Sequence, residues 1–193
     1  MAVKLWLIRH GRTALNEAGK YQGRLDEGLS ANGRAVLHRA DFMPEHIYVS
    51  PAKRARETAA ILFPGREQTV ADDLREMDFG AFEGRSWREM EHDAAYRAWV
   101  DGGCLGCCPG GEDKDEYTAR VCAAVAEMLK NESDCSDLAI VAHGGTQMAV
   151  LERWGVPAKA FYEWQLPCGC GYELEWDAGR QTLRVVREVS FNT

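Results

Sequence analysis

Histidine and arginine side chains directly follow a short apolar segment near the start of this 193-residue sequence. The segment covers residues 3–8, and Arg9, His10 and Arg12 come after it. A neutral imidazole can attack phosphorus and carry the phosphoryl group briefly as a phosphohistidine. An arginine beside it can bind two phosphoryl oxygens, because its planar guanidinium donates two parallel hydrogen bonds. This pattern makes His10 a candidate nucleophile for phosphoryl transfer.

Two later apolar segments lead into residues of the same kinds. Arg54 comes shortly after residues 46–50, and His143 and Gly144 come directly after residues 138–142. In open α/β sheets, ligands bind at the carboxyl ends of the strands. If the three segments are strands, these side chains therefore meet on one rim of the sheet. Each residue alone is weak evidence, and their joint occurrence favours a phosphate site.

Strands and helices are expected to alternate along most of the chain. This pattern predicts a three-layer α/β/α sandwich with a mostly parallel sheet, in a single domain spanning residues 1–193. The alternating polarity of the C-terminal part predicts an antiparallel pair of strands. The expected strands are 3–8, 46–50, 67–71 at an edge, 138–142, 171–176 and 182–189, and the expected helices are 30–43, 54–63, 86–100, 112–132 and 146–154.

Residues 72–111 interrupt this alternation and are rich in glycine, tryptophan and charged side chains. We call them the lid segment, because an insertion of this kind is expected to cover one end of the sheet. Its carboxylates include Glu76, Asp78 and Glu83, and a surface position is the ordinary interpretation of each one. A carboxyl group shielded from water could instead protonate the leaving alcohol of a phosphate ester.

Five blocks of the sequence resemble the motifs of the histidine phosphatase (phosphoglycerate mutase-like) superfamily. The resemblance extends from about residue 3 to residue 155. It implies the phosphoglycerate mutase-like fold and phosphoryl transfer through a phosphohistidine. The blocks are 7–13 with Asn16, 50–59, 74–84, 109–112 and 141–145.

The resemblance also implies roles for the residues of these blocks. His10 is the nucleophile, and Glu76 is the proton donor to the leaving oxygen. Glu83 is the nearest alternative donor, although its position before a glycine is more typical of packing or hydrogen bonding, and Asp78 is a third candidate. The phosphate pocket is formed by Arg9, Arg54 and His143, with further donors from Asn16 and the backbone of Gly144.

Three more residues are candidate binding residues. Arg12 could face a second anionic group of the substrate or pair with an acidic residue of the lid segment, and the sequence does not decide between these. Gln22 and Gly23 follow the first block and are expected to border the pocket.

The net charge of −7 limits the possible partners. An acidic surface repels nucleic acid and anionic membranes, so neither is expected as a partner. A small phosphate ester remains compatible if the arginines converge in one cleft. No apolar stretch approaches the roughly 20 residues of a membrane span, and the short first segment lacks the features of a signal peptide. We therefore expect a cytoplasmic monomer or homodimer that needs no metal and no cofactor.

Seven cysteines are an unusual number for such a chain. An odd count argues against a closed disulfide framework and favours reduced thiols. Zinc binding and a local redox pair are the alternatives, although neither spacing is that of a standard zinc site. The cysteines concerned are Cys104, Cys107, Cys108, Cys168 and Cys170.

The resemblance leaves three functions open. A phosphatase acting on small molecules is favoured, because the lid segment lacks the extra basic, proline-rich stretch of the family's mutases. Phosphoglycerate mutase and a non-catalytic module that binds phosphate esters are the alternatives. The start of the chain and residues 76–84 are similar to α-ribazole phosphatases, and they also occur in broad-specificity phosphatases.

Overall fold

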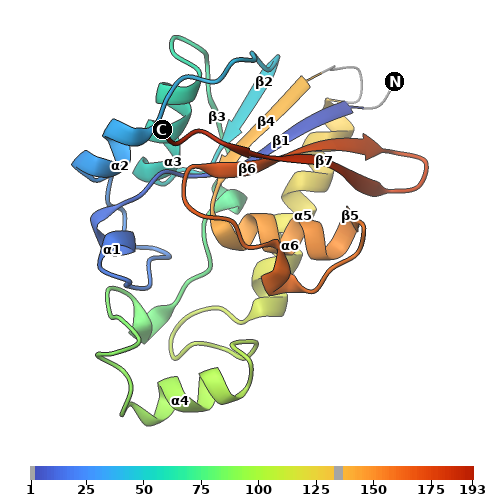
Figure 1. Ribbon diagram of the computed structural model, residues 1–193. Helices are drawn as coiled ribbons and strands as arrows, with labels where there is room; N and C mark the ends of the chain where they lie inside the picture. Colours follow the sequence, from blue (N-terminus) through green and yellow to red (C-terminus); the bar gives the residue numbers. More distant parts are fainter. Residues whose placement is uncertain (1–2, 133–136) are drawn as a thin grey trace.

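The computed structural model describes residues 3–132 and 137–193, and a seven-stranded sheet lies at its centre (Figure 1). The strand order is β3-β2-β4-β1-β6-β7-β5. Strands β1, β2, β3 and β4 pair in parallel, while β6 runs antiparallel to both β1 and β7. The strands are β1 (Val3–Arg9), β2 (His46–Val49), β3 (Thr69–Val70), β4 (Asp137–Ala142), β5 (Gly155–Val156), β6 (Cys170–Asp177) and β7 (Thr182–Ser190).

Helices cover both faces of the sheet and complete three layers (Figure 1). Helices α5 and α6 lie on one face, and α2 and α3 lie on the other. The helices are α1 (Ala14–Glu17), α2 (Ala31–Val36), α3 (Lys53–Leu62), α4 (Ala94–Asp101), α5 (Lys114–Asn131) and α6 (Gly144–Trp154), with 3₁₀ turns at Asp72–Leu74, Gly80–Phe82 and Phe161–Trp164. The predicted α/β/α sandwich with a mostly parallel sheet is confirmed.

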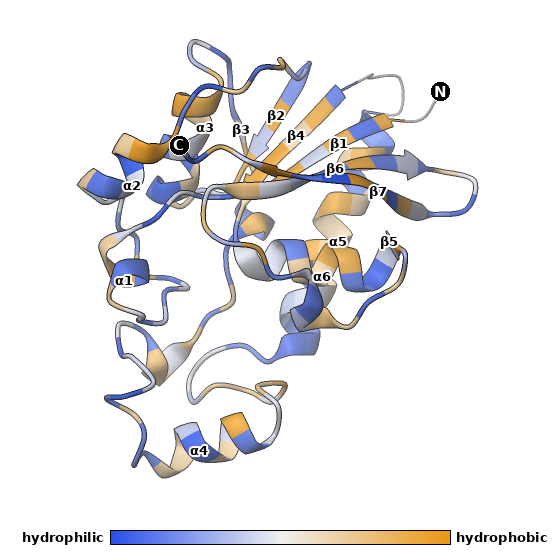
Figure 2. Ribbon diagram, viewed as in Figure 1, coloured by the Kyte–Doolittle hydropathy of each residue, from blue (hydrophilic) through white to orange (hydrophobic). Residues whose placement is uncertain are grey.

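The apolar side chains of β1 supply two cores, because successive residues of a strand point to opposite faces. Leu5 and Leu7 pack with α5 and α6, whereas Trp6 and Ile8 pack with α3. The central strands are correspondingly hydrophobic in Figure 2. Burial on both faces explains why the run reads as continuously apolar.

The helix predicted at 30–43 is wrong in its second half. Ser30 does cap α2, accepting a hydrogen bond from Gly33 N at 2.8 Å. The helix ends after Val36, because Leu37 is extended and pairs with Asn192 near the C-terminus. Backbone bonds to the C-terminal strand region thus replace those that a longer helix would make.

The helix predicted at 86–100 is also too long. Helix α4 covers only Ala94–Asp101, because the Asp93 side chain caps it by accepting from Ala95 N and Tyr96 N. Residues before this cap form turns, and Trp87 is 55% exposed. The other predicted strands and helices are present with shifted ends. Within residues 3–132 and 137–193, the helices are too short or too polar to span a bilayer.

Candidate active site

His10 lies immediately after β1, at the carboxyl end of the parallel part of the sheet. Its backbone is held by a bond from His10 N to Ala142 O of β4 at 2.9 Å. Its ring nitrogen Nδ1 lies 2.7 Å from the carbonyl oxygen of Gly11. Because a carbonyl only accepts, Nδ1 carries the proton and donates it. The other nitrogen, Nε2, is thus left with a free lone pair.

The surroundings of His10 keep its imidazole neutral. Burial lowers the pKa of His10 well below its ordinary value, and the charges of Arg54 and Arg9 lower it further. The bond to Gly11 acts in the opposite direction and is the weakest of these influences. A neutral imidazole is the form that can act as a nucleophile.

We expect this lowered pKa to be visible in the dependence of activity on pH. The ordinary histidine pKa is about 6.5, so an unperturbed His10 would lose its nucleophilic form below that pH. Because the pKa of His10 is lower, kcat/KM for p-nitrophenyl phosphate should not fall between about pH 7.5 and about pH 6.0. A pH–rate profile measures this. An acid limb with its midpoint near 6.5 would contradict the neutral, buried state of His10.

Arg54 is fully buried at the start of α3, next to His143. Its Nη1 donates to Leu25 O at 2.9 Å, and its Nη2 donates to Gly23 O at 2.9 Å and to His143 Nδ1 at 3.3 Å. A guanidinium buried without a paired carboxylate is costly. Its position therefore favours a negatively charged ligand beside it.

Two buried guanidinium nitrogens, Arg9 Nε and Arg54 Nε, have no hydrogen-bond partner within the described parts of the chain. Arg9 Nη1 does donate to Leu166 O, at 2.6 Å. Buried donors are nearly always paired in proteins, so unpaired ones require an explanation. Phosphoryl oxygens arriving next to His10 would supply the missing acceptors.

His143 follows β4 and lies against His10, with a distance of 5.2 Å between the ring centroids. Since arginine can only donate, His143 Nδ1 accepts from Arg54, and His143 Nε2 therefore carries the proton and donates to Ser50 Oγ at 2.7 Å. Burial lowers the pKa of His143 well below its ordinary value, and Arg54 lowers it further. His143 is thus a neutral group that orients Arg54.

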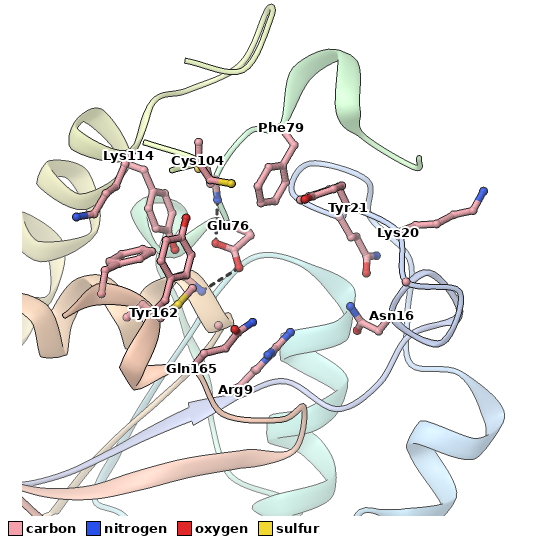
Figure 3. A pocket seen from close by; sticks show the side chains of 18 of the residues that line it. Arg9, Asn16, Lys20, Tyr21, Glu76, Phe79, Cys104, Lys114, Tyr162 and Gln165 are labelled. Carbon is pink, nitrogen blue, oxygen red and sulfur yellow. Dashed lines mark hydrogen bonds between the residues drawn. The ribbon is translucent and has the colours of Figure 1, made fainter. Parts of the chain in front are cut away.

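Glu76 lies in the lid segment and is only 9% exposed. Its Oε1 accepts from Met77 N at 3.0 Å, and its Oε2 accepts from Gly145 N at 3.2 Å (Figure 3). A side chain at position 145 would place its Cβ 2.3 Å from Glu76 Oε1, so a glycine is needed there. The first turn of α6 therefore holds the Glu76 carboxyl at the pocket.

The other two candidate proton donors do not line this pocket. Both oxygens of Glu83 accept backbone N–H groups, from Gly23, Arg24, Leu25 and Phe79. Asp78 accepts from Gly80 N and faces Arg24. The geometry thus separates Glu76 from its two alternatives.

Some of the remaining candidate binding residues line the pocket, and others do not. Asn16, Gln22 and Gly144 line the pocket together with His10 and Arg9. Asn16 also forms a capping box with Thr13, and Gln22 accepts from Thr13 Oγ1 at 2.6 Å.

Arg54 and His143, behind His10, and Gly23 and Arg12 lie outside the pocket lining. Gly23 is buried and contributes its carbonyl to Arg54. The side chain of Arg12 is exposed, and it makes no ion pair with the lid segment among the described residues.

Comparison with known proteins identifies the family. The model of the histidine phosphatase superfamily (branch 1) matches residues 5–189. The chain belongs to the histidine phosphatase superfamily. Its sequence is 32% identical over 196 residues to the adenosylcobalamin/alpha-ribazole phosphatase of Salmonella typhimurium, covering 95% of this chain and 96% of that protein. The predicted family and the predicted enzyme class are confirmed, and the chain is a phosphatase.

The chain is also similar to a protein of a different name and to a solved structure. The chain is 34% identical over 168 residues to a probable phosphoglycerate mutase of Enterobacter, covering 82% of this chain and 78% of that protein. The crystal structure of the alpha-ribazole phosphatase from Shigella flexneri has a TM-score of 0.82 to this structure at 25% identity, with 99% of each chain covered. The shared fold therefore extends over the whole described chain, lid segment included.

The pocket of this histidine phosphatase has a volume of about 380 Å³ and is walled mainly by aromatic and apolar side chains. Figure 3 shows Tyr21 and Phe79 on one side and Tyr162 on the other, with Glu76 and Arg9 between them. Trp99 of α4 packs on Tyr21 at a centroid distance of 5.8 Å.

Sequence reasoning missed several of these pocket residues. Tyr162 lies in the 3₁₀ turn that follows α6, and Gln165 lies directly after this turn. No sequence motif marks this part of the chain. Tyr117 lies on the buried face of α5. Its helical spacing to Val121 was the one sequence feature that could have indicated its burial.

The cysteines of the phosphatase form no disulfide among the described residues. Six thiols are free, and Cys135 lies outside the described residues. Among residues 3–132 and 137–193, no group of three or more histidine, cysteine, aspartate or glutamate side chains could hold a metal ion. Cys104 lines the pocket, whereas Cys168 is buried with its Sγ 3.6 Å from Asn16 Oδ1.

Proposed function

We propose that the phosphatase hydrolyses a small-molecule phosphomonoester by transferring its phosphoryl group to His10 Nε2. The observation that carries this proposal is the bond from His10 Nδ1 to Gly11 O, which fixes the tautomer and leaves Nε2 unprotonated. The unpaired Nε atoms of Arg9 and Arg54 provide donors for the phosphoryl oxygens. The N-terminus of α6 at Gly144 favours an anion as well, through the helix dipole.

Glu76 donates a proton in the first step of this reaction and accepts a proton in the second. In the first step the N–P bond forms, the P–O bond to the alcohol breaks, and the Glu76 carboxyl gives its proton to the alcohol oxygen. In the second step Glu76 takes a proton from water, whose oxygen attacks phosphorus while the N–P bond breaks. One carboxyl group can serve as acid and then as base, because the attacking water takes the position that the leaving alcohol vacated.

The walls of the pocket favour an ester whose alcohol carries a flat, apolar ring. Tyr21, Phe79 and Tyr162 lie on opposite sides of a space that an aromatic ring could fill (Figure 3). Relatives named as alpha-ribazole phosphatases are similar to this chain over nearly its whole length. We propose α-ribazole 5′-phosphate, with its benzimidazole base, as the substrate.

The expected result is a preference for α-ribazole 5′-phosphate over glycerol phosphate in kcat/KM. Aromatic stacking contributes about 1 kcal/mol, so Tyr162→Ala should lower kcat/KM for the aromatic ester by about fivefold. Steady-state kinetics on the two esters measure both values. Tyr162→Phe is the matched control, because it keeps the ring and removes only the hydroxyl.

Two outcomes would count against this substrate. If glycerol phosphate were the better substrate, the aromatic walls would not be selecting the alcohol. If Tyr162→Ala lowered kcat/KM equally for both esters, the ring would support the pocket rather than contact the base.

Phosphoglycerate mutase activity is the alternative that one of the relatives' names raises. A phosphoglycerate also carries a carboxylate, which needs a free cation beside the phosphate site. The two lysines that line the pocket are already paired, Lys20 with Glu89 at 3.4 Å and Lys114 with Glu152 at 2.7 Å. This pairing supports hydrolysis, and mutase turnover exceeding hydrolysis would overturn it.

Four properties remain predictions from the sequence. They are the cytoplasmic location, the monomeric or homodimeric state, the exclusion of nucleic acid as a partner, and the single domain over residues 1–193.

A further inference from the structure

Glu83 is a lid-segment carboxylate outside the pocket that binds the backbone of residues 23–25. Its Oε1 accepts from Gly23 N and Arg24 N, both at 2.9 Å, and from Phe79 N at 3.2 Å. Its Oε2 accepts from Gly23 N at 3.1 Å and Leu25 N at 3.3 Å. Four backbone N–H groups, three of them from successive residues, thus donate to a single side chain.

The carbonyl groups of the same stretch hold Arg54. Gly23 O and Leu25 O each accept from the guanidinium at 2.9 Å, and Gln22 O lies 3.5 Å from Nη2. Residues 22–25 therefore lie between a carboxylate on their N–H side and a guanidinium on their C=O side. Such chains of hydrogen bonds polarise one another and strengthen each bond.

The contact between this stretch and the lid segment is very close. A Cβ on residue 23 would lie 1.9 Å from Met77 O and 2.5 Å from Glu83 Oε1, so only a glycine fits. The peptide of Gly23 consequently has little freedom to shift while Glu83 holds it. Any movement of these carbonyls would change where Arg54 points.

We propose that Glu83 is a positioning residue, which acts through the backbone of residues 22–25 to aim Arg54 at the phosphoryl group. This inference rests on the proposed function, in which Arg54 binds the phosphoryl oxygens. It gives the lid segment a second task, separate from the proton transfer assigned to Glu76. Glu83 itself touches neither the substrate nor His10.

The first test is the isosteric variant Glu83→Gln, which replaces one acceptor with an NH₂ group facing N–H donors. Because charge-assisted hydrogen bonds are lost, inorganic phosphate should inhibit this variant with a Ki about tenfold higher than in the wild type. The loss in kcat/KM should be equal for p-nitrophenyl phosphate and glycerol phosphate, because Arg54 binds the group that both esters share. Asp93→Asn is the matched control, since it removes a lid-segment carboxylate that caps α4.

A double-mutant cycle with Arg54→Met separates positioning from general support of the fold. If Glu83 acts through Arg54, adding Glu83→Gln to Arg54→Met should change the phosphate Ki by less than about twofold, so the two effects are not additive. Arg54→Lys serves in the same cycle if the methionine variant does not fold, with circular dichroism and thermal melting as checks.

The outcomes distinguish this inference from the function on which it rests. Fully additive effects, or a loss for Glu83→Gln that depends on the leaving group, would overturn the role of Glu83. An Arg54→Met variant that folds and keeps the wild-type phosphate Ki would instead overturn the proposed phosphate site. A control Asp93→Asn with the same rise in Ki as Glu83→Gln would show that any disturbance of the lid segment has this effect, and would also overturn the inference.

Discussion

His10→Ala should reduce kcat for every phosphomonoester by about 10⁴-fold or more, because loss of a nucleophile removes the covalent route. The remaining groups would still bind the ester, since Arg9 and Arg54 are unchanged. Inhibition by inorganic phosphate should therefore persist in the variant. Steady-state turnover of p-nitrophenyl phosphate measures the loss, and quenched-flow with a labelled ester detects the phosphoryl group on the protein.

His92→Ala is the control for His10→Ala, because the His92 side chain is 90% exposed and does not line the pocket. The wild type and this control should both give an acid-labile, base-stable phosphoprotein after a rapid quench. His10→Ala should give none. Turnover by His10→Ala at the wild-type rate, or a label that remains on it, would contradict the assignment of the nucleophile.

Glu76→Gln is expected to have the second-largest effect, and its size should depend on the alcohol. A general acid contributes about 10²- to 10⁴-fold, and poor leaving groups need it most. The loss for glycerol phosphate should fall in that range, whereas p-nitrophenyl phosphate should lose far less in the step that forms the phosphohistidine. Single-turnover kinetics on both esters isolate that step.

Glutamine at position 76 keeps the shape of the side chain and one acceptor oxygen for Met77 N or Gly145 N. Glu91→Gln is a suitable control, since Glu91 lies in the lid segment, its side chain is 56% exposed and it does not line the pocket. Equal losses for the two esters in Glu76→Gln would move the acid role to another group.

The layered fold and the grouping of the candidate phosphate-binding residues could be predicted from sequence, because each depends on short-range signals. The apolar runs around Leu7, Val49 and Val141 mark buried strands, and His10 and His143 follow two of them directly. Placement at strand ends is a general property of such sheets, so these residues could be brought together without coordinates.

The substrate side of the pocket could not be predicted in the same way. Tyr162, Tyr21 and Phe79 come from turns whose path is set by contacts far away in the sequence, and aromatic residues there read equally well as core. The end of α2 shows the same limitation, because pairing of Leu37 with Asn192 overrides a helical pattern. Local propensity is a weak guide when tertiary contacts compete with it.

Because β1 pairs with β4, activity requires that nearly the whole chain has folded. The proposed nucleophile His10 directly follows β1, and the register of β1 with β4 runs from Lys4↔Asp137 to Arg9↔Ala142. Contacts between such distant segments form late, because closing a long loop costs entropy before any contact compensates it. During synthesis on the ribosome, β1 therefore cannot pair with β4 until most of the chain has emerged. Regain of activity after denaturation should consequently lag behind the recovery of helical signal.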